Sequence, residues 1–300
     1  MSPEGQGGLL LVHAHPDDET LATGLALAHH ARLGVPTHVL TCTLGEEGEV
    51  IPPELAHLDA AHDDALGPYR REELRSAMAV LGVTHEVLGE AEAAGRGSLY
   101  RDSGMAGTAS AKDPRAFVNA DLDEAADLVR AVVRRLRPAA LVTYDREGGY
   151  RHPDHIQTHR VTCAALAALG AAEQPALYAV VTPRSWARED REWLAAHPPQ
   201  APWSLPDPDG EYPPSVVEDE LVTHELRVPT LMPVLAQALR QHRTQVTVAP
   251  DGLTYALSND IAARLPGREG YAPLDPATGE LVPPAKVGPR HTGLLRGGSA

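Results

Sequence analysis

Cysteine and lysine are scarce in this chain of 300 residues, and each scarcity excludes a class of protein. The two cysteines, Cys42 and Cys163, lie far apart in apolar segments, so they cannot form the disulfide framework of a secreted chain. Only two of the 26 basic residues are lysines, and 41 acidic residues leave a formal net charge of −15. Affinity for nucleic acid depends on clustered basic side chains, so we expect no nucleic-acid partner.

Long hydrophobic runs are also missing. The longest apolar stretch, near "TCAALAALGAA" at 162–172, is shorter than the roughly 20 residues that span a bilayer. The first residues carry no basic region ahead of their short apolar run, which is not typical of an export signal. We therefore expect a soluble, cytoplasmic protein without a membrane partner. The hydrophobic fraction of 43% indicates a folded chain with a substantial core.

Apolar runs alternate with segments of helical spacing along the first 185 residues. The runs at 7–12 and 37–43 have the composition of strands buried on both faces, and the segment between them has helical spacing and ends at a glycine. This alternation predicts an α/β fold with a mostly parallel, Rossmann-like sheet covered by helices. We assign residues 1–185 to this core and place the functional site in it.

The rest of the chain is divided into two parts. Residues 186–265 are predicted to form a smaller α+β portion that completes the pocket, with a proline-rich loop at 197–220 and a hairpin at 247–257. Residues 266–300 are rich in proline and glycine, and we expect them to form a poorly ordered tail.

Two clusters of histidine and acidic residues directly follow predicted strands. The first, "AHPDDE", contains His15 and Asp18 on either side of a turn stiffened by proline, a spacing that lets an imidazole and a carboxylate reach one ion. The second, "HPDH", opens a helix, with His152 near the N-cap and His155 in the first turn. Open α/β sheets bind ligands beyond the carboxyl ends of their strands, so both clusters are expected at one site.

A lone histidine is more often a surface or core residue than a metal ligand. We interpret the following histidines in that way: His13, His29, His30 and His159. Two clusters with the same placement instead indicate a shared metal centre. Two imidazoles, one carboxylate and a water are the usual ligands of hydrolytic zinc, so Zn²⁺ is expected. Fe²⁺ fits the same ligands, whereas magnesium prefers oxygen.

These motifs resemble the hallmarks of the LmbE-like, or PIG-L, family of metal-dependent de-N-acetylases. Within the family the chain is most similar to the deacetylases of the mycothiol pathway, which remove acetate from N-acetylglucosaminyl-inositol. That similarity lies in the segments 41–51, 67–74, 101–108, 142–159 and 244–260. The resemblance thus implies a zinc-dependent amide hydrolase that acts on a small N-acetylated glucosaminide.

The resemblance also implies a role for each matching residue. His15, Asp18 and His155 would bind zinc, Asp17 would act as the general base, and His152 would stabilise the oxyanion or act as an acid.

Four further residues would support this set. Tyr150 would assist at the oxyanion, and Asp154 would orient His152 through its second ring nitrogen. Arg70 and Asp102 would hold hydroxyl groups of the sugar or inositol. The chain departs from the family pattern at 151, where an arginine replaces an expected small residue and would narrow or recharge the pocket mouth.

Three alternatives remain open at the level of sequence. An amidase for mycothiol S-conjugates and a deacetylase of the bacillithiol pathway would use the same metal chemistry on another substrate. A sugar-binding module would keep the fold without turnover. A dinucleotide-binding enzyme is disfavoured, because the only early glycine cluster, "GQGG", precedes the first strand instead of following it.

Overall fold

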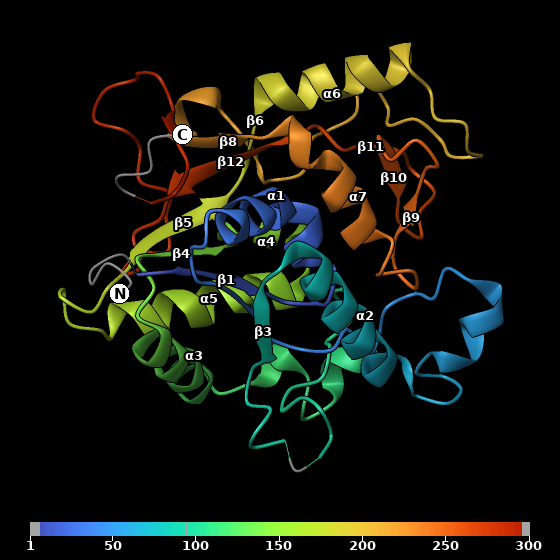
Figure 1. Cartoon of the computed structure of the whole chain (residues 1–300). Coiled ribbons are helices and arrows are strands. Elements are labelled where there is room, and N and C mark those ends of the chain that lie inside the picture. The colour runs from blue at the N-terminus through green and yellow to red at the C-terminus, as the bar shows by residue number, and fades with distance from the viewer. Residues whose placement is uncertain (1–6, 94, 296–300) are drawn as a thin grey trace.

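A central eight-stranded sheet lies between two layers of helices in the computed structural model, which describes residues 7–93 and 95–295 (Figure 1). The strand order is β13-β8-β12-β5-β4-β1-β2-β3. Five neighbouring strands run parallel: β3 (Thr84–Val87), β2 (Thr37–Thr41), β1 (Leu9–His13), β4 (Ala140–Thr143) and β5 (Ala176–Val180). The predicted α/β fold with a mostly parallel sheet is therefore confirmed.

The sheet reverses its strand order at β1. From β1 the chain proceeds to β2 and β3 on one side, and it later returns to β4 and β5 on the other side. β1 is consequently hydrogen-bonded to both β2 and β4. Open α/β sheets bind ligands at such a reversal, beyond the carboxyl ends of the two diverging strands. The segments that follow β1 and β4, distant in sequence, begin side by side at this point.

Successive side chains of β1 point into two different cores. Leu9 and Leu11 belong to one core, and Leu10 and Val12 to the other. The first core is covered by α1 (Asp18–Arg32), α2 (Leu66–Leu81) and α7 (Met232–Leu239), and the second by α3 (Leu122–Leu136) and α5 (Pro153–Ala167). Figure 1 shows α1 on one side of the sheet and α3 with α5 on the other. Burial on both faces explains why the strand is apolar at every position.

The chain beyond β5 extends the same sheet. β12 (Arg268–Pro273) pairs antiparallel with β5, β8 (His224–Arg227) pairs antiparallel with β12, and β13 (His291–Thr292) pairs parallel with β8. β12 falls within 266–300, the segment expected to be a tail. Its sequence, "REGYAP", contains the two residue types least common in strands, which concealed it. Gly270 is required there, because a Cβ would lie 2.7 Å from the Val181 carbonyl oxygen.

Smaller elements complete the fold. Helix α6 (Arg184–Ala196) was missed by the sequence analysis, which ended the regular alternation near residue 185. The predicted hairpin is confirmed as β9 (Thr247–Val248) and β10 (Thr254–Ala256). The remaining short elements are β6 (Thr182–Pro183), β7 (Val216–Val217), β11 (Ala263–Arg264), α4 (Gly148–Arg151) and five 3-10 turns at Pro53–Leu58, Ser110–Lys112, Phe117–Asn119, Asp219–Leu221 and Pro229–Leu231. Within the described residues, no helix has the length and apolar character that crossing a membrane requires.

Candidate active site

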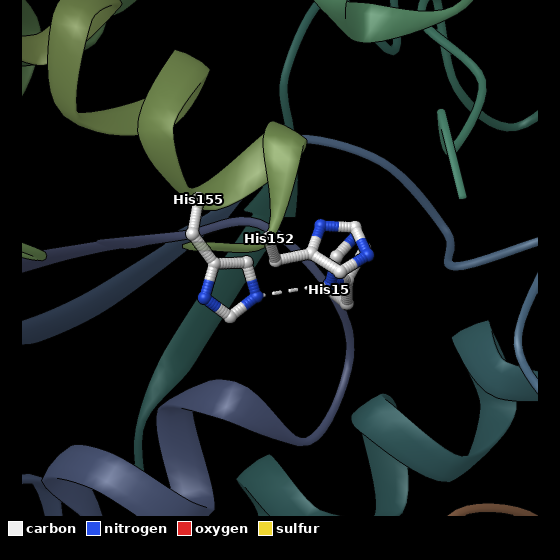
Figure 2. A group of neighbouring side chains, drawn as sticks. All are labelled: His15, His152 and His155. Carbon is white, nitrogen blue, oxygen red and sulfur yellow. Dashed lines mark hydrogen bonds between the residues drawn. The ribbon is translucent and has the colours of Figure 1, made fainter. Parts of the chain in front are cut away.

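The two histidine motifs meet beyond the carboxyl ends of β1 and β4. His15 and Asp18 follow β1, and His155 lies in the first turn of α5. The His155 Nε2 atom is 3.3 Å from His15 Nδ1 and 3.2 Å from Asp18 Oδ2. His15 Nδ1 is 3.4 Å from the same carboxylate oxygen. Figure 2 shows the imidazoles of His15, His152 and His155 gathered where the two segments meet.

These three atoms form a nearly equilateral triangle with edges of 3.2 to 3.4 Å. A tetrahedral zinc ion with bonds of roughly 2.0–2.1 Å separates its ligand atoms by about 3.3 Å. The donor set and its spacing therefore fit a metal ion. Two overlapping groups have ligand atoms within 4.8 Å of one another: His15, His152 and His155, and His15, Asp102 and Asp154.

The two ring nitrogens of His15 have different neighbours: Nδ1 faces the other two members of the triangle, and Nε2 faces two further carboxylates. His15 Nε2 lies 3.2 Å from Asp154 Oδ2 and 3.5 Å from Asp102 Oδ1. A proton on Nε2 satisfies these carboxylates and leaves the Nδ1 lone pair directed at Asp18 and His155. Burial alone would lower the pKa of His15, but the acidic neighbours, Asp102 first, raise it well above its usual value. The pocket is thus arranged to hold positive charge.

The predicted role of Asp154 is wrong in one respect. Its carboxylate contacts His15 and accepts the Ser103 N–H at 2.9 Å, and it does not orient His152. The Asp154 N–H instead donates to His152 Nδ1 at 3.2 Å, so His152 caps α5 and its remaining ring proton lies on Nε2. Burial, together with the charges of His15 and His155, lowers the pKa of His152 to about 3. A pKa of about 3 leaves the ring neutral at neutral pH, with its Nε2–H available to donate a hydrogen bond.

Asp17 lies between the two motif ligands in an unusual backbone conformation. Its φ of 127° belongs to a region that residues with side chains rarely adopt. Its N–H donates to Glu19 Oε2 at 3.0 Å, and its Oδ2 lies 3.4 Å from the Arg70 guanidinium. Burial raises the pKa of Asp17 to about 7, although Arg70 opposes the shift. A carboxylate with such a pKa is suited to accept a proton near neutral pH.

Arg70 and Asp102 are almost fully buried beside these residues. The Arg70 guanidinium donates to the Pro16 carbonyl at 2.6 Å and to the Gly45 carbonyl at 2.8 Å. The φ of 65° at Gly45 favours glycine, and a Cβ there would lie 2.0 Å from Arg70 Nη1 and displace the guanidinium. Asp102 accepts the Gly104 N–H at 2.8 Å, while His15 lowers its pKa against the effect of burial. Both predicted residues therefore lie at the site and are already engaged with the protein.

Tyr144 is a site residue that the sequence analysis missed. It directly follows β4, and its hydroxyl donates to Asp18 Oδ2 at 2.8 Å and accepts the Ala14 N–H at 2.9 Å. Its ring stacks on His155 with centroids 4.2 Å apart. The predicted Tyr150 meets His155 edge-on at 4.9 Å and is 53% exposed. The position of Tyr144 immediately after a strand was the available signal.

Arg151 does not narrow the pocket as expected. Its side chain is 70% exposed and its Nε pairs with Glu147 at 3.2 Å. The histidines interpreted as ordinary have partners away from the triangle: His13 contacts Thr23, and His30 contacts the Ala26 carbonyl of its own helix.

A cavity of about 380 Å³ opens beside the triangle. Asp18, Tyr144 and His155 form part of its wall. Residues of the C-terminal part also line it, among them Trp186, Asp190, Arg264 and Arg268. A larger hollow of about 690 Å³ beside β8 and β13 contains none of the motif residues, so the smaller cavity is the one next to the chemistry.

Comparison with known proteins identifies the family. The PIG-L model, described as GlcNAc-PI de-N-acetylase, matches residues 10–166. The 1D-myo-inositol 2-acetamido-2-deoxy-alpha-D-glucopyranoside deacetylase of Rhodococcus jostii is 50% identical over 283 residues, which cover 91% of this chain and 93% of that protein. The deacetylase of the same name from Thermomonospora curvata is 44% identical over 300 residues, or 96% of each.

A solved structure shares the fold. A deacetylase in complex with teicoplanin, from the biosynthesis pathway of teicoplanin, superposes with a TM-score of 0.50 at 18% identity, covering 89% of this chain and 98% of its own. The family resemblance of the two motifs is confirmed by the match over residues 10–166 and by relatives at up to 50% identity over nearly the whole chain. The chain belongs to the PIG-L family.

Proposed function

We propose that this chain hydrolyses the acetamide of N-acetylglucosaminyl-inositol to glucosaminyl-inositol and acetate, as a step of mycothiol biosynthesis. Relatives with 44 to 50% identity and nearly full coverage carry the name of this deacetylase, which supports the substrate. The observation that carries the chemistry is the triangle of His15 Nδ1, Asp18 Oδ2 and His155 Nε2. We place the enzyme in a reducing cytoplasm, which the two unpaired buried cysteines favour.

His15, Asp18 and His155 are the residues that would hold Zn²⁺, with Fe²⁺ as the alternative ion. When bound, the ion supplies Lewis acidity toward the substrate carbonyl and toward water. Asp154 and Tyr144 orient two of these ligands from behind, by their contacts with His15 Nε2 and Asp18 Oδ2.

Asp17 accepts the proton of the attacking water. Its pKa of about 7 keeps a useful fraction ionised while leaving a proton for the departing amine. His152 donates its Nε2–H to the carbonyl oxygen as negative charge collects there, and one such donor contributes about 3–4 kcal/mol. The Tyr150 hydroxyl at the cavity wall assists at the same oxygen.

Arg70 and Asp102 would bind hydroxyl groups of the sugar or inositol. Arg70 Nε has no hydrogen-bond partner among residues 7–93 and 95–295. Asp102 Oδ1 is engaged by the Gly104 N–H and His15 Nε2, whereas Oδ2 accepts the Glu47 N–H and retains a lone pair for a hydroxyl.

Acetate release from N-acetylglucosaminyl-inositol tests the proposal, with protein stripped of metal and then reloaded with zinc or ferrous iron. Asp17→Asn should still bind one ion per chain, while turnover falls by at least about 100-fold because the base is lost. Full activity of this variant would refute the role of Asp17. Cleavage of a mycothiol bimane conjugate without acetate release would identify the amidase, and tight glycoside binding without turnover would identify a binding module.

A further inference from the structure

Glu19 and His242 form a buried pair, and Glu19 contacts the backbone of Asp17. Neither side chain has any exposed surface. His242 Nε2 lies 3.0 Å from Glu19 Oε1, and the Thr20 hydroxyl donates to the same oxygen at 2.5 Å. A buried carboxylate without a partner is costly, so this pairing stabilises Glu19 in its place.

The other oxygen of Glu19 acts on Asp17. Glu19 Oε2 accepts the Asp17 N–H at 3.0 Å, while the Asp17 carbonyl accepts the N–H groups of Thr20 and Leu21 at the start of α1. The peptide on each side of Asp17 is thereby fixed. A non-glycine residue at φ 127° is strained and persists only where its surroundings impose that conformation. Glu19 supplies part of that constraint.

His242, the partner of Glu19, belongs to the C-terminal part of the chain. His242 lies just after α7, and Glu73 on α2 anchors the same segment by accepting the N–H and hydroxyl of Thr244 at 2.9 and 2.6 Å. Arg70, one turn earlier on α2, lies 3.4 Å from the Asp17 carboxylate. Arg70 thus restrains the Asp17 side chain, and Glu19, paired with His242, restrains the Asp17 backbone.

We propose that Glu19 and His242 are positioning residues for Asp17. Their contacts hold the Asp17 backbone in its left-handed conformation, so that its carboxylate points at the reacting water. The inference rests on the proposed function, because it assumes that Asp17 is the base. Neither residue contacts the cavity, so substrate binding and metal binding should not depend on them.

The experiment is a double-mutant cycle between His242 and Asp17 in the zinc-loaded full chain. We expect His242→Ala to lower kcat about 10- to 100-fold, because a displaced catalytic group loses much of its effect. KM and zinc content should stay unchanged, and His242→Gln, which retains a donor for Glu19, should recover most of kcat. In an Asp17→Asn background, His242→Ala should cause little further loss.

The control is His30→Ala, which removes a different buried imidazole, one on α1 whose Nδ1 bonds to the Ala26 carbonyl at 2.8 Å. An equal loss of kcat in this control, an unchanged kcat in His242→Ala, or the same fold loss with and without Asp17 would each overturn the proposal. If His242→Ala does not fold, Glu19→Gln is measured in the same cycle with the same criteria.

The wild-type measurement separates this inference from the proposed function. Wild-type chain that cleaves the bimane conjugate but not N-acetylglucosaminyl-inositol overturns the proposed substrate alone, and the cycle is then run on the conjugate. Wild-type chain that cleaves neither substrate overturns both.

Discussion

Replacing Tyr144 with phenylalanine removes one hydroxyl group. Tyr144 directly follows β4, and this hydroxyl connects it to the motif that follows β1. That hydroxyl donates to Asp18 Oδ2 and accepts the Ala14 N–H. The stacking of the ring on His155 and its edge contact with His13 do not involve the hydroxyl, so phenylalanine can retain them. The substitution therefore isolates two hydrogen bonds.

Two effects follow from the geometry. Ala14 has no exposed surface, so its N–H is left unpaired, which costs about 1–3 kcal/mol of folding free energy. Asp18 Oδ2, the oxygen directed at His155 and His15, loses the Tyr144 hydroxyl as a donor and keeps the His15 N–H at 3.0 Å. Loss of such an outer partner weakens metal binding about 10- to 100-fold. We expect both changes in Tyr144→Phe.

Competition with a chromophoric chelator measures the zinc affinity, and urea unfolding of the metal-free protein measures stability. The matched control is Tyr150→Phe, which removes a tyrosine hydroxyl from the neighbouring ring and should change zinc affinity by less than about threefold. A zinc affinity of Tyr144→Phe equal to that of the wild type would refute the assignment of Asp18 as a ligand oriented by Tyr144.

Two further predictions concern stability. Burial raises the pKa of Glu269 from 4.5 to about 7, so the unfolded chain loses the proton first and stability is lost as pH rises from about 4.5 toward about 7. Glu269→Gln removes this titration and should weaken the pH dependence of the urea midpoint in that range; an unchanged pH dependence would contradict this. Burial and the neighbouring His291 lower the pKa of His224 from 6.5 to about 4, so the unfolded chain binds the proton first and stability is lost as pH falls from about 6.5 toward about 4. His224→Gln should reduce this acid sensitivity, and an identical pH dependence of unfolding would show that His224 is not its source.

Local pattern was enough to predict the strands and the position of the motif loops. The apolar runs ending at His13 and Thr143 mark β1 and β4, and the ligand residues come directly after them. Their convergence depends on β1 and β4 being neighbours, which alternation alone does not specify. The convergence was predicted from the general rule that open α/β sheets bind ligands beyond the carboxyl ends of their strands.

The contacts that local pattern did not predict are made between side chains that only tertiary packing brings together. Asp154 is two residues from His152 in the motif, yet its carboxylate contacts His15 and only its backbone N–H contacts His152. Tyr144 and His242 lie outside the two histidine motifs, and each contacts a residue far away in sequence, Asp18 and Glu19 respectively. β12 was hidden because it contains a glycine and a proline, which are uncommon in strands; the glycine, Gly270, allows a close approach to the Val181 carbonyl.

The most direct test of the central claim is the X-ray absorption spectrum of the zinc-loaded protein, compared with those of His15→Ala and His155→Ala. We predict one ion per chain with two imidazole nitrogens and oxygen ligands at roughly 2.0–2.1 Å, and one imidazole fewer in each variant. Spectra that keep both imidazoles in the two variants would show that the ion binds elsewhere, and would contradict the account.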